Sequence, residues 1–337
     1  MKMMAEKDEI PERRNPLRWW NQYARRYSIQ LSVFGVLLVL FTIFIIVRPG
    51  VFLSYDIYFA FMSSIPFTAI SALALTLVII AGEIDLSFPS VMGFGGWVFT
   101  NLFVSTKNIT FALFGCLVIG ALIGACNGLL VTKVRIPSLI ATIGTMYLWR
   151  GITMILCEGR GTPLVAAKAT MLFHVLVGRL PWKKIPLQAV WTIVIAVILW
   201  FVLNRHKFGL RLYHVGDSVS SARMVGINTD RVKIITFMLM GFLATYAGVL
   251  ASLEVSYLWP TLGGGYLIKV VAAVFVGGTS ISGGEGTLFG TFIGCIIIGC
   301  LEAGIIAMGM TGFWTQAVYG AVIVISLSFY SFIRRGS

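Results

Sequence analysis

The chain has 337 residues, of which 58% are hydrophobic and only 12% are charged, and its formal net charge is +13. Soluble domains are about half apolar and about a quarter charged, so this composition excludes an ordinary water-soluble protein and indicates a protein of the lipid bilayer. The basic residues lie in the gaps between apolar stretches rather than on one soluble face, which argues against nucleic acid as a partner.

Residues 1–28 are polar and basic and contain Trp19 and Trp20, which predicts an interfacial lead-in on the cytoplasmic side. Ten apolar stretches follow, each able to form a spanning helix of about 20 residues. They predict an all-α polytopic membrane protein with a transmembrane domain over 29–332 and a cytoplasmic tail at 333–337. The ten stretches are residues 29–47, 57–81, 88–106, 111–131, 137–157, 187–203, 233–256, 266–281, 287–307 and 313–332.

Ten spans place both termini on the same side of the membrane, and positive charge indicates which side. The N-terminal segment, Lys133 with Arg135, the segment 204–232, and the C-terminal Arg334 with Arg335 all fall on one side, which we assign to the cytoplasm. One loop does not fit this pattern. Residues 158–186 fall in the periplasm in this topology, although they contain five Lys and Arg residues.

A polar break at residues 81–87 separates the second and third stretches and contains Glu83, Asp85 and Ser87. An unpaired carboxylate in hydrocarbon costs several kcal/mol, so such groups face water, a cavity or a partner. Two interpretations stay open. The break is either a structured turn beside a transport pathway or an ordinary interfacial loop in which Asp85 or Ser87 caps the next helix.

Residues 76–96 and 272–292 share one plan: an apolar run, a polar break with glycine, and a glycine-bearing helix. Transporters are often built from repeats with interrupted helices, so this plan predicts an internal repeat; the alternative is two similar tight loops. Glycines also recur at four-residue spacing, which favours close helix packing in membranes. They are Gly120, Gly124 and Gly128 in one stretch and Gly290 and Gly294 in another.

The segment 204–232 is the most polar stretch between the spans. Its middle, from about Asp217 to Met224, can form a short helix that Asp217 or Ser218 caps and Gly226 ends. Such a helix on the cytoplasmic side suits a docking partner, whereas the plain alternative is a charged loop. Three charges inside the spans are functional candidates by default: Glu254, Lys269 and Glu302. The sequence leaves open whether Lys269 pairs with either acid.

No phosphate-binding G-x-x-x-x-G-K-[ST] sequence and no Cys or His cluster with metal-ligand spacing occurs in the chain. The three histidines fall in loops and form no recognisable catalytic set. We therefore expect no enzyme, no cofactor and no metal.

Four ordered motifs resemble those of the ribose-type inner-membrane permeases of ABC importers, a family related to the branched-chain amino acid permeases. The resemblance covers about Pro49 to Phe332. The motifs are Gly82–Ser87; Asn127–Val131 with Arg135–Pro137, Ala141–Thr145 and Arg150–Gly151; Gly209–Lys233; and Ala272–Thr291.

This resemblance implies a type II-like permease in the bacterial inner membrane that imports a sugar, a polyol or a similar small polar solute. Two permease chains, identical or paralogous, would form the pathway, a cytoplasmic ATPase would bind the segment 204–232, and a periplasmic binding protein would deliver the solute. A nucleoside or amino-acid permease and an ion-coupled secondary transporter are the alternatives. The residues implied in ATPase coupling are Gly216, Asp217, Ala222, Arg223, Gly226, Ile227 and Asn228.

The sequence departs from this family at the eighth stretch, where many members read GYELDAIAAV. Here Lys269 takes the place of the second acid, and in the first break Glu83 replaces a glycine. Our hypothesis is that Lys269 lies near the pathway and favours electron-rich or anionic solutes; the alternative is that it snorkels to the interface or pairs with an acid. The candidate pathway or break residues are Glu83, Asp85, Ser87, Tyr266, Lys269, Gly277, Gly278, Thr279 and Ser280.

Overall fold

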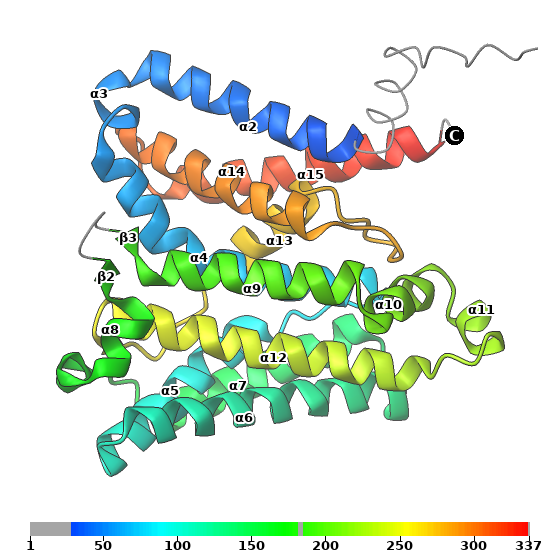
Figure 1. Cartoon of the computed structure of the whole chain (residues 1–337), viewed down its shortest axis with the longest axis horizontal. Helices are drawn as coiled ribbons and strands as arrows, with labels where there is room; N and C mark the ends of the chain where they lie inside the picture. Colours follow the sequence, from blue (N-terminus) through cyan, green and yellow to red (C-terminus); the bar gives the residue numbers. More distant parts are fainter. Residues whose placement is uncertain (1–27, 181–184, 336–337) are drawn as a thin grey trace, which may run out of the picture.

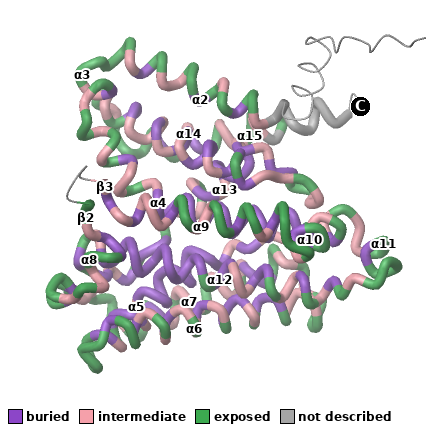
Figure 2. The backbone as a smooth tube through the Cα atoms, in the orientation of Figure 1, coloured by how far each residue is buried: buried purple, intermediate pink, exposed green. Residues whose placement is uncertain are grey.

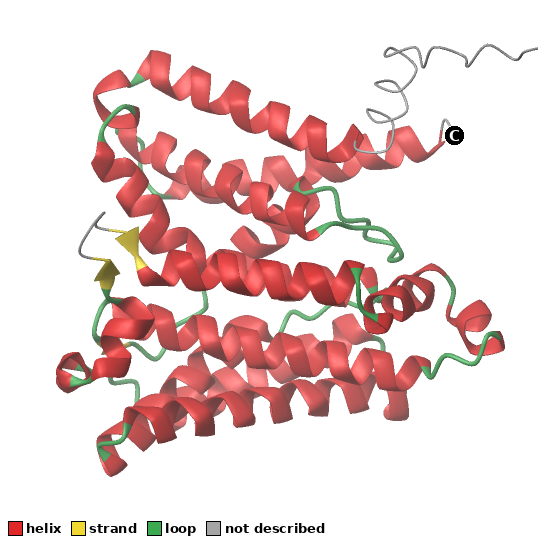
Figure 3. Ribbon diagram, in the orientation of Figure 1, coloured by secondary structure: helices red, strands yellow, loops and turns green. Residues whose placement is uncertain are grey.

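A computed structural model describes residues 28–180 and 185–335, and this part of the chain is almost entirely helical (Figure 3). All of the predicted N-terminal segment except Ser28 lies outside the described residues, as do the last two residues of the predicted tail. The last helix runs on to Arg335, so the expected end of the transmembrane domain at residue 332 does not coincide with the end of a helix.

The first half of the chain forms α2 (Ser28–Val47), α3 (Pro49–Phe52), α4 (Tyr55–Ile80), α5 (Phe88–Thr106), α6 (Ile109–Leu129), which continues as a π-helical turn (Leu130–Val134), and α7 (Ser138–Leu156). A region of short elements follows: β1 (Thr162–Pro163), a 3₁₀ turn (Val165–Ala169), α8 (Met171–Val177), β2 (Arg179–Leu180) and β3 (Ile185–Pro186). The second half forms α9 (Leu187–Asn204), α10 (Lys207–Asp217), α11 (Val219–Met224), α12 (Thr229–Glu254), β4 (Tyr257–Leu258), α13 (Tyr266–Val276), α14 (Leu288–Ala307) and α15 (Phe313–Arg335).

Each of the ten predicted stretches contains a helix, but the eighth is shorter than expected. It ends at Val276 rather than at residue 281. Its 11 residues extend about 16 Å at 1.5 Å per residue, roughly half of a bilayer core. Within the described residues, seven helices are long and apolar enough to cross a membrane: α2, α4, α6 with its π-helical turn, α7, α9, α12 and α14.

Helices α4 and α12 form the core of the bundle (Figure 2). Of their most apolar windows, 83% and 72% are buried, against 17% for α2 and for α7. The apolar side chains of the outer helices, such as Ile140 and Tyr147 of α7, are exposed and suit contact with lipid. The chain therefore has a buried centre of protein contacts and an apolar outer surface.

The predicted glycine packing is confirmed. A Cβ atom on Gly124 of α6 would overlap the carbonyl group of Phe237 in α12, and one on Gly294 of α14 would overlap the carbonyl group of Ala273 in α13. Because lipid gives no hydrophobic drive for helix association, such close backbone contacts supply the packing energy.

The two ends of the bundle differ (Figure 1). α10 and α11 lie at one end, where α2 begins and α15 ends. Lys133 lies at this end too, since it forms a 2.8 Å ion pair with Asp230 at the start of α12. The basic regions predicted to share one side of the membrane, so far as they are described, thus share one end of the bundle.

The opposite end carries the region 158–186, which is more than a loop (Figure 1). Its described part contains α8 and the strands β1, β2 and β3; β2 pairs with β3, and β1 pairs with β4, both antiparallel. Pairing of β1 with β4 joins this region to the segment that follows α12, because Thr162 lies opposite Leu258. The sequence analysis did not predict these elements, because two-residue strands leave no hydrophobic pattern and a helix of seven residues is too short to be recognised as a span.

Candidate functional site

The two predicted breaks begin with the same helix-ending structure. After α4, Gly82 has φ 78°, its N–H donates to Ile79 O, and the N–H of Glu83 donates to Val78 O. This is a Schellman motif, in which glycine relieves the strain of positive φ.

After α13 the same pattern recurs. Gly278 has φ 82°, its N–H donates to Phe275 O, and the N–H of Thr279 donates to Val274 O. The two segments also contact each other. Thr76 lies in α4 before the first break and Thr291 in α14 after the second, and their hydroxyl oxygens are 2.7 Å apart. The two segments predicted to be repeats therefore share backbone geometry as well as sequence plan.

Both carboxylates of the first break have partners. Asp85 is buried and accepts hydrogen bonds from the N–H and the hydroxyl of Ser87, at 2.7 and 2.6 Å. Asn127 of α6 in turn donates to the hydroxyl of Ser87 at 2.7 Å. Ser87 occupies the N-cap position of α5, but its side chain makes no capping bond; of the two predicted caps, only Asp85 accepts a backbone N–H at the start of this helix.

Glu83, the other carboxylate, forms an ion pair with Lys233 of α12, and the two side chains are only 12% and 15% exposed. Replacing Lys233 with methionine should lower the free energy of unfolding by about 3–5 kcal/mol, because Glu83 would remain buried without its counter-charge. The double variant Lys233→Met/Glu83→Gln should recover most of this loss. A double-mutant cycle on thermal unfolding in detergent measures the effect, and a double variant no more stable than Lys233→Met contradicts it.

The first break runs along α7 into the bundle. Ile84 N–H donates to Ser138 at the start of α7, and Leu86 N–H donates to Thr142, both at 3.1 Å. Arg150, 12 residues after Ser138, donates to Pro89 O at 3.2 Å. Twelve helical residues span about 18 Å, so α5 begins well inside the bundle.

Arg150 also holds the segment that precedes α13. Its guanidinium donates to Pro260 O at 3.1 Å and to Leu262 O at 2.8 Å. Gly263 follows with φ 90°, so close to Pro89 O that a Cβ atom would overlap it. α13 thus begins inside the bundle beside the start of α5. Arg150 entered the sequence argument only as a motif residue, although an arginine within an apolar helix is itself a signal.

The polar segment 204–232 contains two helices rather than one. Asp217 is the last residue of α10, and Ser218 caps α11 by accepting from Ser221 N–H at 3.2 Å. The predicted end is confirmed, since Gly226 follows α11 with φ 80°. α10 was not predicted as a helix because it begins only three residues after α9 and mixes apolar with charged residues, although three of its residues, Gly209, Leu212 and Val215, are buried.

The remaining predicted coupling residues build the turn from α11 to α12. Ala222 is buried, and its carbonyl accepts from Ile227 N–H at 3.0 Å. Asn228 caps α12 by accepting from Arg231 N–H at 2.9 Å. Arg223 donates to Thr229 at 3.1 Å. At the tip, Met224 and Val225 are 80% and 72% exposed.

The end of α10 contacts both breaks through backbone atoms. A Cβ atom on Gly216 would overlap Ile80 O at the end of α4 and would lie 2.5 Å from the amide nitrogen of Gly284. Gly284 N–H itself donates to Ile80 O at 3.0 Å. We call this contact of α4, α10 and the loop 277–287 the glycine junction.

A side chain reinforces the glycine junction. The hydroxyl of Tyr213 in α10 donates to Gly286 O at 2.8 Å. Burial raises the pKa of the Tyr213 phenol above its usual value of 10, so this donor keeps its proton at physiological pH. In the second break itself, Ser280 N–H donates to Glu285 O, whereas the buried hydroxyl of Thr279 has no partner within the described residues.

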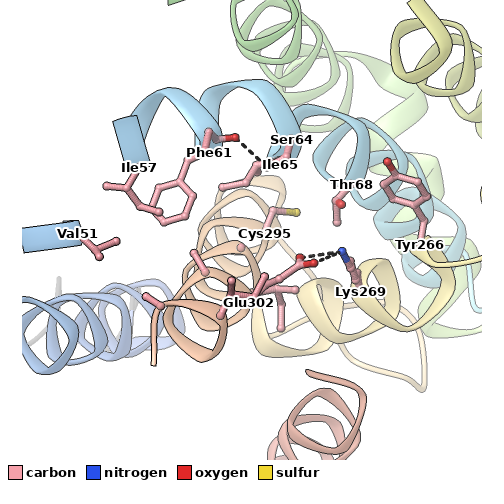
Figure 4. A pocket seen from close by; sticks show the side chains of 16 residues that line it. Val51, Ile57, Phe61, Ser64, Ile65, Thr68, Tyr266, Lys269, Cys295 and Glu302 are labelled. Atoms are coloured by element: carbon pink, nitrogen blue, oxygen red, sulfur yellow. Dashed lines mark hydrogen bonds and ion pairs between the residues drawn. The ribbon is translucent and has the colours of Figure 1, made fainter. Parts of the chain in front are cut away.

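A pocket of about 420 Å³ lies between α4, α13 and α14 (Figure 4). Lys269 of α13 lies there with its ammonium 2.7 Å from each carboxylate oxygen of Glu302 in α14. Of the two interpretations of Lys269, pairing with an acid is therefore observed, and the pair faces a cavity as well. Tyr266 lines the same pocket, whereas the other predicted pathway residues lie in the breaks.

A model of the family described as "Branched-chain amino acid transport system / permease component" matches residues 57–327. The ribose import permease protein of Escherichia coli strain K12 is 33% identical over 307 residues, which cover 90% of this chain and 94% of the relative. That of Bacillus subtilis strain 168 is 34% identical over 76% of this chain and 79% of the relative. The autoinducer 2 import system permease protein of Klebsiella pneumoniae is 30% identical over 88% of this chain and 84% of the relative. No solved structure matches the chain significantly.

Proposed function

Because the chain belongs to the branched-chain amino acid transport permease family, we propose that it is the membrane-spanning permease subunit of an ABC importer for a sugar or similar small polar solute. The family match over residues 57–327 carries this proposal and confirms the resemblance found in the sequence motifs. Relatives named for ribose and for autoinducer 2 support a small polyhydroxylated solute, with nucleosides and amino acids as alternatives.

We place ten membrane segments in the bacterial inner membrane, with α13 as an interrupted segment of half length. The end with α10 and α11 faces the cytoplasm, because the described basic regions gather there. The end with α8 and the strand pairs faces the periplasm, where a solute-binding protein would dock. A second permease chain, identical or paralogous, would complete the pathway in the bilayer.

We assign ATPase docking to α11 and its flanking turns. The exposed Met224 and Val225 are apolar side chains at the tip of a polar segment, and such exposed apolar residues suit a protein contact. The glycine junction then gives the docked ATPase a route to the breaks, because α10 contacts them through its backbone. The partner ATPase hydrolyses ATP, and this chain forms the pathway that changes conformation.

ATP-driven uptake tests the proposal. The chain, reconstituted in proteoliposomes with its operon's ATPase and binding protein, should take up one of a panel of labelled pentoses, hexoses, polyols and nucleosides only when ATP is present. A Gly226→Pro variant should lower uptake at least tenfold, because proline cannot adopt φ 80° and removes the N–H that donates to Arg223 O.

Gly309→Pro is the control for the backbone change and should keep ATP-driven uptake. Gly309, after α14, has a similar φ of 77° and donates its N–H to Ile306 O, but it lies outside the turn from α11 to α12. Uptake that proceeds without ATPase and binding protein would instead identify an ion-coupled secondary transporter. Wild-type uptake by Gly226→Pro would show that this turn is not required for coupling.

A further inference from the structure

The ion pair of Lys269 and Glu302 opens onto the pocket between α4, α13 and α14. The two side chains keep 26% and 34% of their surface exposed, so the pair is not sealed between the helices. Charged groups inside membrane segments face pathways or cavities, because hydrocarbon does not solvate them. Resting on the proposed function, we propose that this pair is a subsite that contacts adjacent hydroxyl groups of a neutral polyhydroxylated solute.

The hydrogen-bonding capacity of the pair matches two adjacent hydroxyls. An ammonium group has three N–H donors, and Lys269 directs donors to both oxygens of Glu302, which leaves one free. The carboxylate has about four acceptor positions, of which Lys269 occupies two, and the phenol of Tyr319 in α15 faces a third. One donor and at least one acceptor position therefore lie side by side. Vicinal hydroxyls, each both donor and acceptor, can use these positions together.

The charge of the pair selects against ions. Lys269 alone would attract anions, which was the hypothesis drawn from the sequence. Glu302, bound through both of its oxygens, neutralises that charge. An anionic solute is therefore attracted by Lys269 and repelled by Glu302. The same reasoning disfavours a cation. A neutral solute meets no such repulsion.

The walls of the pocket suit the rest of a sugar. Phe61 and Ile65 of α4 and Ile298 of α14 form an apolar side. The hydroxyls of Thr68 and Tyr266 line the pocket and make no hydrogen bond within the described part of the chain (Figure 4). The volume of about 420 Å³ lies in the range of small-molecule pockets, about 300–1,000 Å³. An apolar wall with a few convergent polar groups is the usual design of such sites.

A thiol-protection experiment tests the subsite without requiring transport. Ser64 is exposed and lines the pocket, so Ser64→Cys gives a reporter in a chain whose Cys126, Cys157 and pocket-lining Cys295 are changed to alanine. Labelling by a membrane-impermeant thiol reagent is followed in proteoliposomes of the full complex without ATP. D-Ribose should slow the labelling. 1,3-Propanediol, which lacks adjacent hydroxyls, and D-ribose 5-phosphate should need at least tenfold higher concentrations.

Variants of the pair give the decisive comparison. Glu302→Gln should reverse the order of D-ribose and D-ribose 5-phosphate, because Lys269 then acts as an unneutralised cation. Lys269→Met/Glu302→Gln leaves no unpaired charge, so it should be at least as stable as either single variant, and it should raise the protecting concentration of D-ribose at least tenfold. Two controls should show no change: labelling of Leu53→Cys, 68% exposed and outside the pocket, and protection in Glu254→Gln.

Absence of protection by D-ribose, or equal protection in the double variant, overturns the subsite. ATP-driven uptake in the same liposomes reports on the importer itself. ATP-driven uptake without protection of the thiol by D-ribose would contradict the subsite but not the importer. Protection by D-ribose together with uptake that does not depend on ATP would contradict the importer but not the subsite.

Discussion

Replacing Gly216 with alanine is expected to lower ATP-driven uptake at least tenfold and to reduce the thermal stability of the chain. The added Cβ atom would overlap Ile80 O and would lie 2.5 Å from the amide nitrogen of Gly284. Both are backbone atoms that cannot rotate away, so the junction must open. Overpacking of this kind costs about 1–3 kcal/mol, and here it acts where α10 contacts both breaks.

The matched control is Gly144→Ala in α7, where a Cβ atom would meet nothing within 4 Å. Alanine favours the helix there, so wild-type uptake and a stability at or slightly above that of wild type are expected. ATP hydrolysis is measured beside uptake. A folded Gly216→Ala complex that hydrolyses ATP without importing solute would show that the junction transmits the partner's movement. Wild-type uptake by this variant would exclude the junction from coupling.

The long helices were predictable from the sequence, because an uninterrupted apolar stretch has few alternatives in a membrane. The second stretch was expected at 57–81 and is α4 at Tyr55–Ile80; the sixth was expected at 187–203 and is α9 at Leu187–Asn204. The cap at Ser218 and the end at Gly226 were also found, since both depend on local chemistry.

The start of α13 at residue 266 was predicted, but its early end at Val276 and its depth in the bundle were not predictable from hydropathy. The segment that enters the bundle before α13 is held by Arg150, more than 100 residues away in the chain. Contacts at that separation leave no periodic signal in one sequence.

In the candidate site, too, features of single residues were predictable from the sequence, whereas contacts between distant segments were not. Lys269 and Glu302 were each recognised as charges inside the membrane, since single residues reveal this. Their pairing depends on how α13 and α14 are rotated toward each other, which sequence spacing within one helix does not determine. The glycine junction likewise joins three segments, and each of its glycines alone indicates only a turn or a close contact.

Arg150 gives the second large expected effect. Its two terminal nitrogens bond three carbonyl oxygens on two segments, Pro89 O in α5 and Pro260 O with Leu262 O before α13. A guanidinium fork can reach these positions together, whereas the single ammonium of lysine cannot. An unsatisfied buried carbonyl costs about 1–3 kcal/mol, so Arg150→Lys should lower the free energy of unfolding by about 2–4 kcal/mol although it keeps the charge.

Thermal unfolding in detergent measures this effect, with Arg160→Lys in the exposed turn after α7 as the control that should not change. A protease that cleaves in the segment 259–265 should cut Arg150→Lys faster than wild type, because this segment loses two hydrogen bonds while the long helices keep theirs. Equal stability and equal cleavage would mean that charge alone suffices at this position. A faster cut with an unchanged unfolding midpoint would locate the role of Arg150 in holding α13 at its start, the helix that carries Lys269 into the pocket.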